Sequence, residues 1–234
     1  MVKHTTHTKR NTSVQNILSR LRTAFNITTL FFQELRRRVY SNRVYQVLRR
    51  DFSVDVVAPE PRIPLFLKKL RPQDIPVFID IWKPDLSKEE VWERIRIRNM
   101  IHSGIQTPYV VVTDNDEPCH IAWLIDSREN EKVKSFFKKR IPPLNADEVL
   151  FELVFTLKEY RGLGIQPWRI REFIEKSVQS GARWAWVYIK STNDVSLKNV
   201  AINAFELCMI RTDKWRFFRC QSEFILLPED TGNH

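Results

Sequence analysis

Hydrophobic positions near the N-terminus recur at the spacing of an amphipathic helix. The segment "NTS" at 11–13 offers an N-cap. The apolar positions after it are Val14, Ile17, Leu18, Leu21 and Phe25, followed by Phe31, Phe32, Leu35 and Val39. This pattern predicts one or two helices. The stretch 56–64 contains three prolines in nine residues, which predicts an extended connector into the main domain.

The rest of the chain alternates between strand and helix patterns. The predicted strands cover 65–70, the two sides of "DNDEP" at 114–118, 148–157 and 183–189, with a final hairpin that turns at Asp213 and Lys214. The predicted helices cover 72–82, 88–103, part of 127–145, 165–179 and 194–204. Ser87 and Glu90 form a capping box for the second of these helices, and Gly104 ends it. This order predicts a mixed α/β architecture with a central sheet flanked by helices.

Length and charge divide the chain into two parts. The 234 residues exceed the usual size of one domain, so we expect one main domain and an appendage. Residues 1–50 contain 11 basic residues and a single acidic residue, Glu34, whereas the remaining 184 residues contain 27 of each. The net charge of +10 therefore belongs to the N-terminal segment. We expect a basic amphipathic helical extension at 1–55, the main domain at 56–228 and a tail at 229–234.

The N-terminal segment has several interpretations. Its apolar positions could pack on the main domain or on a second subunit in a homodimer. Residues 11–50 could instead contact an anionic membrane surface, and the composition also fits an organelle transit peptide. Nucleic-acid binding is not expected, because aromatic residues do not interleave with the arginines as a stacking platform and the main domain is neutral.

Composition excludes several classes of protein. No window approaches the roughly 18 consecutive apolar residues of a membrane-spanning helix, and no secretory signal pattern is found. Cys119, Cys208 and Cys220 show neither metal-ligand spacing nor a paired framework. We therefore expect a soluble cytoplasmic protein with reduced thiols and no metal.

Two of only 5 glycines, Gly162 and Gly164, lie between an apolar run and a helical pattern. Glycine accepts positive φ angles and lets a ligand approach the backbone, so a glycine pair that opens a helix indicates an anion cradle.

The sequence around this turn resembles a known family. Arg161, Gly164 and Gln166 lie at the three fixed positions of the pattern Arg/Gln-x-x-Gly-x-Gly/Ala. The later segment "NDVSLKNVAINAFEL" resembles the Asn-x-x-Ser-Leu…Gly-Phe-Glu segment of the same family. With the order of elements, these motifs make residues 62–227 similar to the GNAT superfamily of acyl-CoA N-acyltransferases. The resemblance implies a GNAT acyltransferase domain within 56–228.

The resemblance further implies that the anion is the pyrophosphate of coenzyme A, with acetyl-CoA or another acyl-CoA as donor. The implied cofactor-binding residues are Thr156 through its backbone amide, the turn residues Arg161, Gly162, Leu163, Gly164, Ile165 and Gln166, and Asn193 and Ser196 of the second segment. For Asn193 the alternative is a helix cap. Gln166 departs from the family's Gly or Ala, and Pro167 has no amide to donate. An acyl carrier protein, which presents the same phosphopantetheine arm, is an alternative donor.

Acyl transfer to an amine requires a base, because an ammonium with a pKa of roughly 10 is not nucleophilic at neutral pH. Glu152 is the ionisable residue within "VLFELVFTL", and strand alternation predicts that it shares a face with Val154 and Thr156. Burial would raise its pKa, which suits a base. The alternative is a solvated or salt-bridged edge residue. His120 is the second candidate, with a satisfied core histidine as its alternative.

The general acid differs from the family pattern. Many members carry a tyrosine where this chain has Val200. Tyr188 is the candidate that remains, with packing as its alternative role, and direct departure of the thiolate would need no acid.

These residues predict an N-acyltransferase, with N-acetyl transfer as the leading expectation, that acts by direct attack of an amine in a ternary complex. An amino sugar, a polyamine and a protein amine are the alternatives for the acceptor. The competing hypothesis is a catalytically inactive GNAT-fold module that binds or assembles through its basic N-terminal helices.

Overall fold

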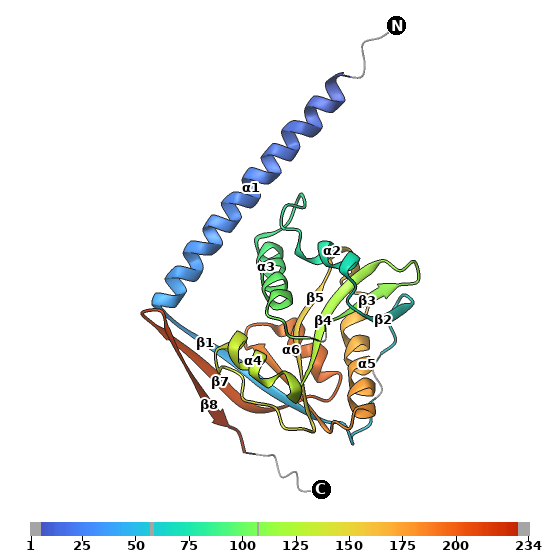
Figure 1. Cartoon of the computed structure of the whole chain (residues 1–234), viewed down its shortest axis with the longest axis vertical. Coiled ribbons are helices and arrows are strands. Elements are labelled where there is room, and N and C mark those ends of the chain that lie inside the picture. The colour runs from blue at the N-terminus through green and yellow to red at the C-terminus, as the bar shows by residue number, and fades with distance from the viewer. Residues whose placement is uncertain (1–5, 57–58, 107, 229–234) are drawn as a thin grey trace.

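An eight-stranded sheet forms the centre of the computed structural model, which describes residues 6–56, 59–106 and 108–228, with side chains from residue 18 onward (Figure 1). The predicted tail at 229–234 lies outside the described residues. The strand order is β2-β3-β4-β5-β6-β1-β7-β8. The strands are β1 (Tyr40–Asp51), β2 (Leu65–Lys69), β3 (Pro108–Thr113), β4 (Pro118–Asp126), β5 (Glu148–Thr156), β6 (Trp184–Lys190), β7 (Glu206–Arg216) and β8 (Arg219–Leu226). Neighbouring strands are antiparallel except for β5 and β6, which confirms the predicted mixed, mostly antiparallel sheet.

Helices cover both faces of this sheet. They are α1 (Thr6–Val39), α2 (Ile75–Ile79), α3 (Lys88–His102), α4 (Asn130–Phe137), α5 (Ile165–Gln179) and α6 (Asp194–Ala201). Residues of α2, α3 and α4 pack with Trp123 and Leu150 in the larger core on one face. Residues of α5 and α6 pack with Phe151 and Val187 in the core on the other face. The central strands β4 and β5 therefore contribute side chains to both cores.

The prediction of a helical extension over residues 1–55 is wrong for residues 40–51, which form the strand β1. It lies between β6 and β7 and pairs with both, so residues 40–51 belong to the middle of the sheet. Val47 and Leu48 are buried. Arg50 is buried too, and its guanidinium donates to the backbone carbonyls of Asn203 and Val54. Part of the basic charge of the N-terminal segment is thus a structural component of the domain.

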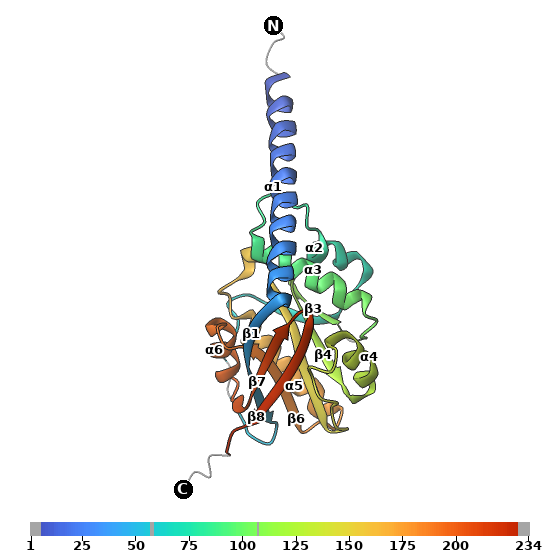
Figure 2. The ribbon, with the colours of Figure 1, turned by 90° about the vertical axis from the view of Figure 1, so that its left-hand side faces the viewer.

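The rest of the N-terminal segment forms one continuous helix, α1, which begins at Thr6 rather than after the predicted N-cap at 11–13. It extends beyond the domain in both views (Figures 1 and 2). Its last turn is held by the β7–β8 hairpin, because the amides of Phe217 and Phe218 donate to the carbonyls of Val39 and Arg38.

The β7–β8 hairpin turns at Phe217 and Phe218, and the predicted turn at Asp213 and Lys214 is wrong. Asp213 is fully buried within β7, where it accepts a hydrogen bond from Ser222 Oγ at 2.8 Å and lies 3.2 Å from the guanidinium of Arg211. A buried, paired aspartate is a core residue rather than a turn former.

Other local predictions agree with the structure. Ser87 and Glu90 form the predicted capping box at the start of α3. The hairpin β3–β4 encloses 114–117, and α5 covers the predicted 165–179. Local capping and turn chemistry therefore specifies these elements.

Candidate functional site

The two parallel strands part in the middle of the sheet. β5 and β6 pair only where Glu148–Leu150 lies beside Trp184–Trp186. Beyond this point, β5 stays paired with β4 and β6 stays paired with β1. A bulge accompanies the separation, since Leu153 has a φ of 48° and the register with β4 shifts there. Such bulges bend a strand and redirect its side chains.

The glycine turn follows the end of β5. Gly162 and Gly164 have φ angles of 80° and 78°, and α5 begins at Ile165. The five consecutive N–H groups of residues 162–166 have no hydrogen-bond acceptor among the described residues. Unpaired amides at a helix N-terminus, reinforced by the helix dipole, form an anion-binding site. The turn therefore has the geometry of the predicted cradle.

The two glycines have different roles. A Cβ at Gly164 would lie 3.3 Å from Pro61 Cα, a tight contact with the backbone of the connector, and the positive φ of 78° also favours glycine there. The connector is fixed at this point by a hydrogen bond of 2.9 Å from the Arg62 amide to the Leu163 carbonyl. A Cβ at Gly162 would meet no atom within 4 Å. Gly162 therefore faces the open side of the turn, where a ligand has access.

Neighbouring elements hold the side chains of the turn. Arg161 Nε donates to the carbonyl oxygen of Thr156 at 3.2 Å, and its guanidinium lies 3.5 Å from Glu90 of α3. The side chain of Gln166 accepts a hydrogen bond of 3.0 Å from Asn199 of α6. This contact directs the Gln166 side chain toward α6. The predicted role of the Thr156 amide stays a prediction.

The second predicted segment lies beside the turn through this α5–α6 contact. Asn193 Oδ1 accepts a hydrogen bond of 3.2 Å from the Ser196 amide and so caps α6. The cap is the alternative that the sequence offered for Asn193. Ligand binding by Asn193 and Ser196 stays a prediction.

The bulge at Leu153 changes the face on which Glu152 lies. Val154 packs in the core beside α5, whereas Glu152 Oε1 lies 3.8 Å from Arg96 of α3 on the opposite face. The prediction that Glu152 shares a face with Val154 and Thr156 is therefore wrong, because the extra residue of a bulge reverses strand alternation.

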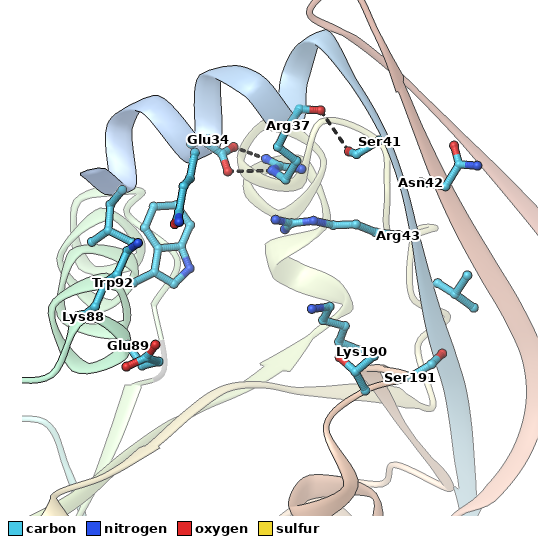
Figure 3. A pocket seen from close by; sticks show the side chains of 14 residues that line it. Glu34, Arg37, Ser41, Asn42, Arg43, Lys88, Glu89, Trp92, Lys190 and Ser191 are labelled. Carbon is cyan, nitrogen blue, oxygen red and sulfur yellow. Dashed lines mark hydrogen bonds and ion pairs between the residues drawn. The ribbon is translucent and has the colours of Figure 1, made fainter. Parts of the chain in front are cut away.

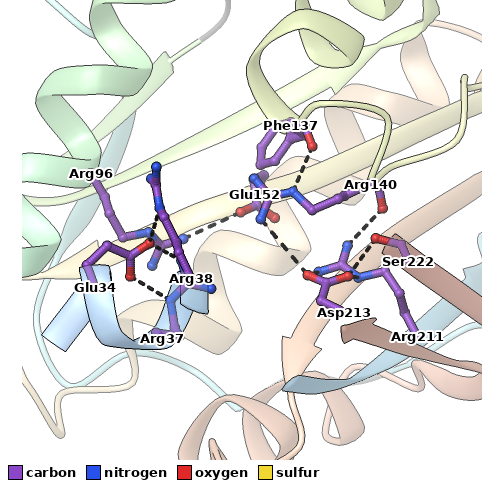
Figure 4. A network of polar contacts seen from close by, with 10 residues as sticks. All are labelled: Glu34, Arg37, Arg38, Arg96, Phe137, Arg140, Glu152, Arg211, Asp213 and Ser222. Carbon is purple, nitrogen blue, oxygen red and sulfur yellow. Dashed lines mark hydrogen bonds and ion pairs between the residues drawn. The ribbon is translucent and has the colours of Figure 1, made fainter. Parts of the chain in front are cut away.

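Glu152 is nearly buried within a network of charged residues (Figure 4). Burial raises its pKa, and the positive charges of Arg96 and Arg211 oppose this rise only in part. Arg211 stacks on the ring of Tyr188, with its guanidinium carbon 5.2 Å from the ring centroid. Burial raises the pKa of Tyr188 as well, so the phenol keeps its proton at neutral pH. A carboxylate with an elevated pKa and a protonated phenol thus lie in one network.

His120 lies apart from this network. It is fully buried, and its Nδ1 is 2.8 Å from Thr156 Oγ1. Burial and the charge of Arg169, which belongs to α5, lower its pKa well below the usual range. The imidazole is neutral, on the side of α5, whereas Glu152 contacts α3. The structure therefore does not bring the two candidate bases together.

A pocket of about 740 Å³ opens between α1, α3, β1 and β6 (Figure 3). The walls contain Trp92 and four basic residues, Arg37, Arg43, Lys88 and Lys190. Arg43 and Lys190 extend toward α3 in Figure 3. The wall also contains two acidic residues, Glu89 and Glu34, of which Glu34 is bound by Arg37. Lys88 and Lys190 have no ion-pair partner among the described residues. The pocket therefore has excess positive charge.

This pocket lies on the same side of the sheet as Glu152. Trp92 and Arg96 are one helical turn apart on α3, and Arg96 contacts Glu152. Lys190 and Tyr188 are two residues apart on β6 and therefore point to one face. Sequence reasoning missed Arg96 and the basic wall residues. The i, i+4, i+8 spacing of Lys88, Trp92 and Arg96 is the signal that could have found part of this wall.

Comparison with known proteins places the fold. No family model and no curated protein matches the chain. Among solved structures, the chain is similar to a GCN5-related glucosamine N-acetyltransferase region of a fungal multi-domain β-N-acetylglucosaminidase. The two are 12% identical in sequence, and the TM-score is 0.51. The match covers 84% of this chain and 22% of that chain. The chain has the GNAT fold. Weaker likenesses are a GCN5-related N-acetyltransferase from Sphaerobacter thermophilus (13% identity, 80% and 57% covered, TM-score 0.45) and a GNAT-family acetyltransferase from Colwellia psychrerythraea (10% identity, 80% and 62% covered, TM-score 0.47).

The chain spans less than two thirds of each of these three proteins. The fold predicted from the glycine turn is confirmed, and N-acetyltransferases share it. Val200 is buried in the core and its side chain offers no proton. Tyr188 as the acid, and direct departure of the thiolate without an acid, both stay predictions. Over the residues that the structure describes, no helix has the length and apolar character needed to cross a membrane.

Proposed function

We propose that this protein is an N-acyltransferase that uses an acyl-CoA to acylate an amine carrying an anionic group. The observation that carries the proposal is the row of five amides at residues 162–166 that have no acceptor among the described residues, at the end of β5 that lies beyond its separation from β6. Glu152 lies on β5 two residues beyond Leu150, the last position that pairs with β6, so a base is available next to this separation.

The turn supplies the binding site for the donor. The amides of residues 162–166 would hold the pyrophosphate, with the open side of Gly162 giving access. Acetyl-CoA supplies an activated acyl group as a thioester. The side chain of Gln166 does not obstruct this site, because its hydrogen bond with Asn199 directs it toward α6. An acyl carrier protein remains the alternative donor, since it carries the same arm without the nucleotide.

Two residues of the network would move protons. Glu152, with its raised pKa, removes a proton from the acceptor ammonium, directly or through water. Tyr188 keeps its proton and is the candidate donor to the leaving group. His120 is neutral and lies on the other side of β5, so it is not assigned a step.

The pocket would bind the acceptor. Within the described part of the chain, Lys88 and Lys190 lack ion-pair partners, and Arg43 extends into the same space, which favours a carboxylate or phosphate on the acceptor. The same charges would repel a polyamine. Of the three acceptor alternatives, an acidic or phosphorylated amino sugar or an acidic protein amine therefore fits better.

The experiment is thiol release from acetyl-CoA with a panel of amines. We expect a phosphorylated amino sugar to react faster than the same sugar without phosphate, and a polyamine not to react. Lys190→Met should raise KM for the phosphorylated sugar at least about tenfold, the worth of one charge-assisted contact. It should leave KM for the unphosphorylated sugar unchanged. A polyamine as the best acceptor would contradict the assignment of the pocket.

The competing hypothesis of an inactive binding module has its own outcome in this assay. Binding of acetyl-CoA without transfer to any amine in the panel, by wild type and by Glu152→Gln alike, would support the module and reject catalysis by Glu152.

A further inference from the structure

The outer side of α1 has an apolar stripe that the domain does not cover. The stripe consists of Leu18, Leu21, Phe25, Phe31, Phe32, Leu35 and Val39, all of which are exposed. Phe25 is 71% exposed and Phe32 is 61% exposed. The opposite side of the helix lines the pocket through Leu30, Glu34 and Arg37. From Leu18 to Val39, packing of the predicted stripe on the main domain, one of the sequence-based alternatives, is therefore wrong, and the side chains of Val14 and Ile17 lie outside the described part of the chain.

A second exposed apolar group adjoins the end of the stripe. Phe217 and Phe218 at the β7–β8 turn are 80% and 55% exposed. Their φ angles are 46° and 66°, a region that disfavours bulky residues and that hairpin turns usually fill with Asn-Gly. Their amides bind the last carbonyls of α1. In Figure 2, α1 and the β7–β8 hairpin lie on the same side of the molecule. The fold thus holds two phenylalanines beside the stripe in an unfavourable backbone conformation.

Positive charge borders both apolar groups. At 3.6 residues per turn, Arg22 and Arg36 lie along one border of the stripe and Arg20 and Arg38 along the other. The turn itself is flanked by Arg216 and Arg219. The single acid of the first 50 residues, Glu34, lies on the pocket side and is bound by Arg37 and Arg38. The exposed side of α1 is therefore apolar and basic.

This charge argues against pairing of two copies through the stripe. The spacing of Leu18, Leu21, Phe25, Phe32, Leu35 and Val39 would suit a coiled coil. Coiled coils pair opposite charges at the positions that border the seam. Here those positions are arginines or uncharged residues, so a parallel or antiparallel pair would bring arginines together without an acid. An anionic lipid surface complements the same charges.

We propose that the apolar stripe and the Phe217–Phe218 turn dock on an anionic lipid surface, with α1 lying in the plane of the interface. Aromatic and aliphatic side chains enter the headgroup boundary, and the bordering arginines bind lipid phosphates. Because α1 also forms one wall of the pocket, docking holds the pocket next to the lipid surface.

The test is flotation of the full chain with vesicles of phosphatidylcholine alone or mixed with phosphatidylglycerol. We expect binding to the anionic vesicles, little binding to the neutral ones, and weaker binding as salt is raised above about 0.1 M, where the screening length is about 10 Å. The double variant Phe25→Ser/Phe32→Ser should lower the partition coefficient at least about tenfold, which corresponds to about 1.4 kcal/mol. Phe66→Ser is the matched control, since Phe66 is a half-exposed phenylalanine on β2.

A second variant tests the hairpin without disturbing the fold. Phe217→Asn/Phe218→Gly suits the backbone of the turn and should still reduce binding to the anionic vesicles. Equal flotation of wild type and both double variants would overturn the proposal, as would no flotation with anionic vesicles at low salt. A dimer that the helix variant converts into monomers, or binding of polyglutamate without binding of vesicles, would assign the stripe to another partner and would also overturn it.

Discussion

Replacing Glu152 with glutamine separates its catalytic role from its structural one. General base catalysis contributes typically about 10²–10⁴-fold in rate, so kcat for acyl transfer should fall by that factor in Glu152→Gln, about 2.7–5.5 kcal/mol in the barrier. The stability of the fold should not fall. Burial raises the pKa of Glu152 above its ordinary value near 4.5 despite Arg96 and Arg211, so the folded state disfavours the ionised carboxylate.

The pH dependence of stability follows from that direction. Above the raised pKa, Glu152 ionises in the folded chain against the cost of burial. Each unit by which folding raises the pKa of Glu152 lowers the free energy of unfolding by about 1.4 kcal/mol. Glu152→Gln should therefore be at least as stable as wild type at neutral pH. This difference should shrink as the pH falls through the raised pKa, because wild type then takes up a proton. Denaturant unfolding at several pH values measures it.

The pH–rate profile provides the readout. Wild-type kcat/KM should rise with pH as Glu152 ionises, and Arg96→Met should move that limb to higher pH, because the charge of Arg96 opposes the rise in the pKa of Glu152. Arg98→Met, an exposed arginine on the same helix, is the control and should not move it. A Glu152→Gln enzyme with the wild-type rate and pH profile would refute the reasoning.

Three further predictions concern the fold. Ser87→Ala removes the α3 cap and should lower the free energy of unfolding by about 1 kcal/mol in a denaturant titration; no change would mean that the cap is dispensable. A chain that starts at residue 52 lacks β1 between β6 and β7 and should show no cooperative thermal transition by circular dichroism, so a melting curve like that of the full chain would contradict the topology. Phe217→Asn/Phe218→Gly should raise the free energy of unfolding by about 1 kcal/mol or more, because it relieves two bulky residues in the left-handed region, and a lower midpoint would show that the phenylalanines stabilise the turn.

The sequence predicted those elements whose ends have specific chemistry. The capping box at Ser87 and Glu90 and the glycine turn before α5 are local signals that packing did not override. β1 was missed because its apolar residues are interrupted by arginines that look solvent-facing in the sequence. Arg50 is nonetheless buried, since its hydrogen bonds are accepted by the nearby carbonyl of Val54 and by the carbonyl of Asn203, far along the chain.

The candidate site was predictable only in part for a similar reason. The row of amides follows from a local pattern, Arg161 to Gln166, and needs no tertiary information. The face of Glu152 depends on the bulge at Leu153, a non-glycine residue with positive φ that no sequence rule indicates. The basic wall of the pocket combines residues of α1, α3, β1 and β6, and only the insertion of β1 into the sheet brings them together.

The most direct test of the central claim is a calorimetric titration with acetyl-CoA of wild type, Gly162→Asp and Gly162→Asn. Position 162 has open space and a positive φ that aspartate and asparagine adopt more readily than most residues, so the two variants differ mainly in charge. The account predicts binding to wild type, modestly weaker binding to Gly162→Asn, and at least about tenfold weaker binding to Gly162→Asp, whose carboxylate repels the pyrophosphate. Absence of binding to wild type, or equal binding to both variants, would contradict the assignment of residues 162–166 as the coenzyme A cradle.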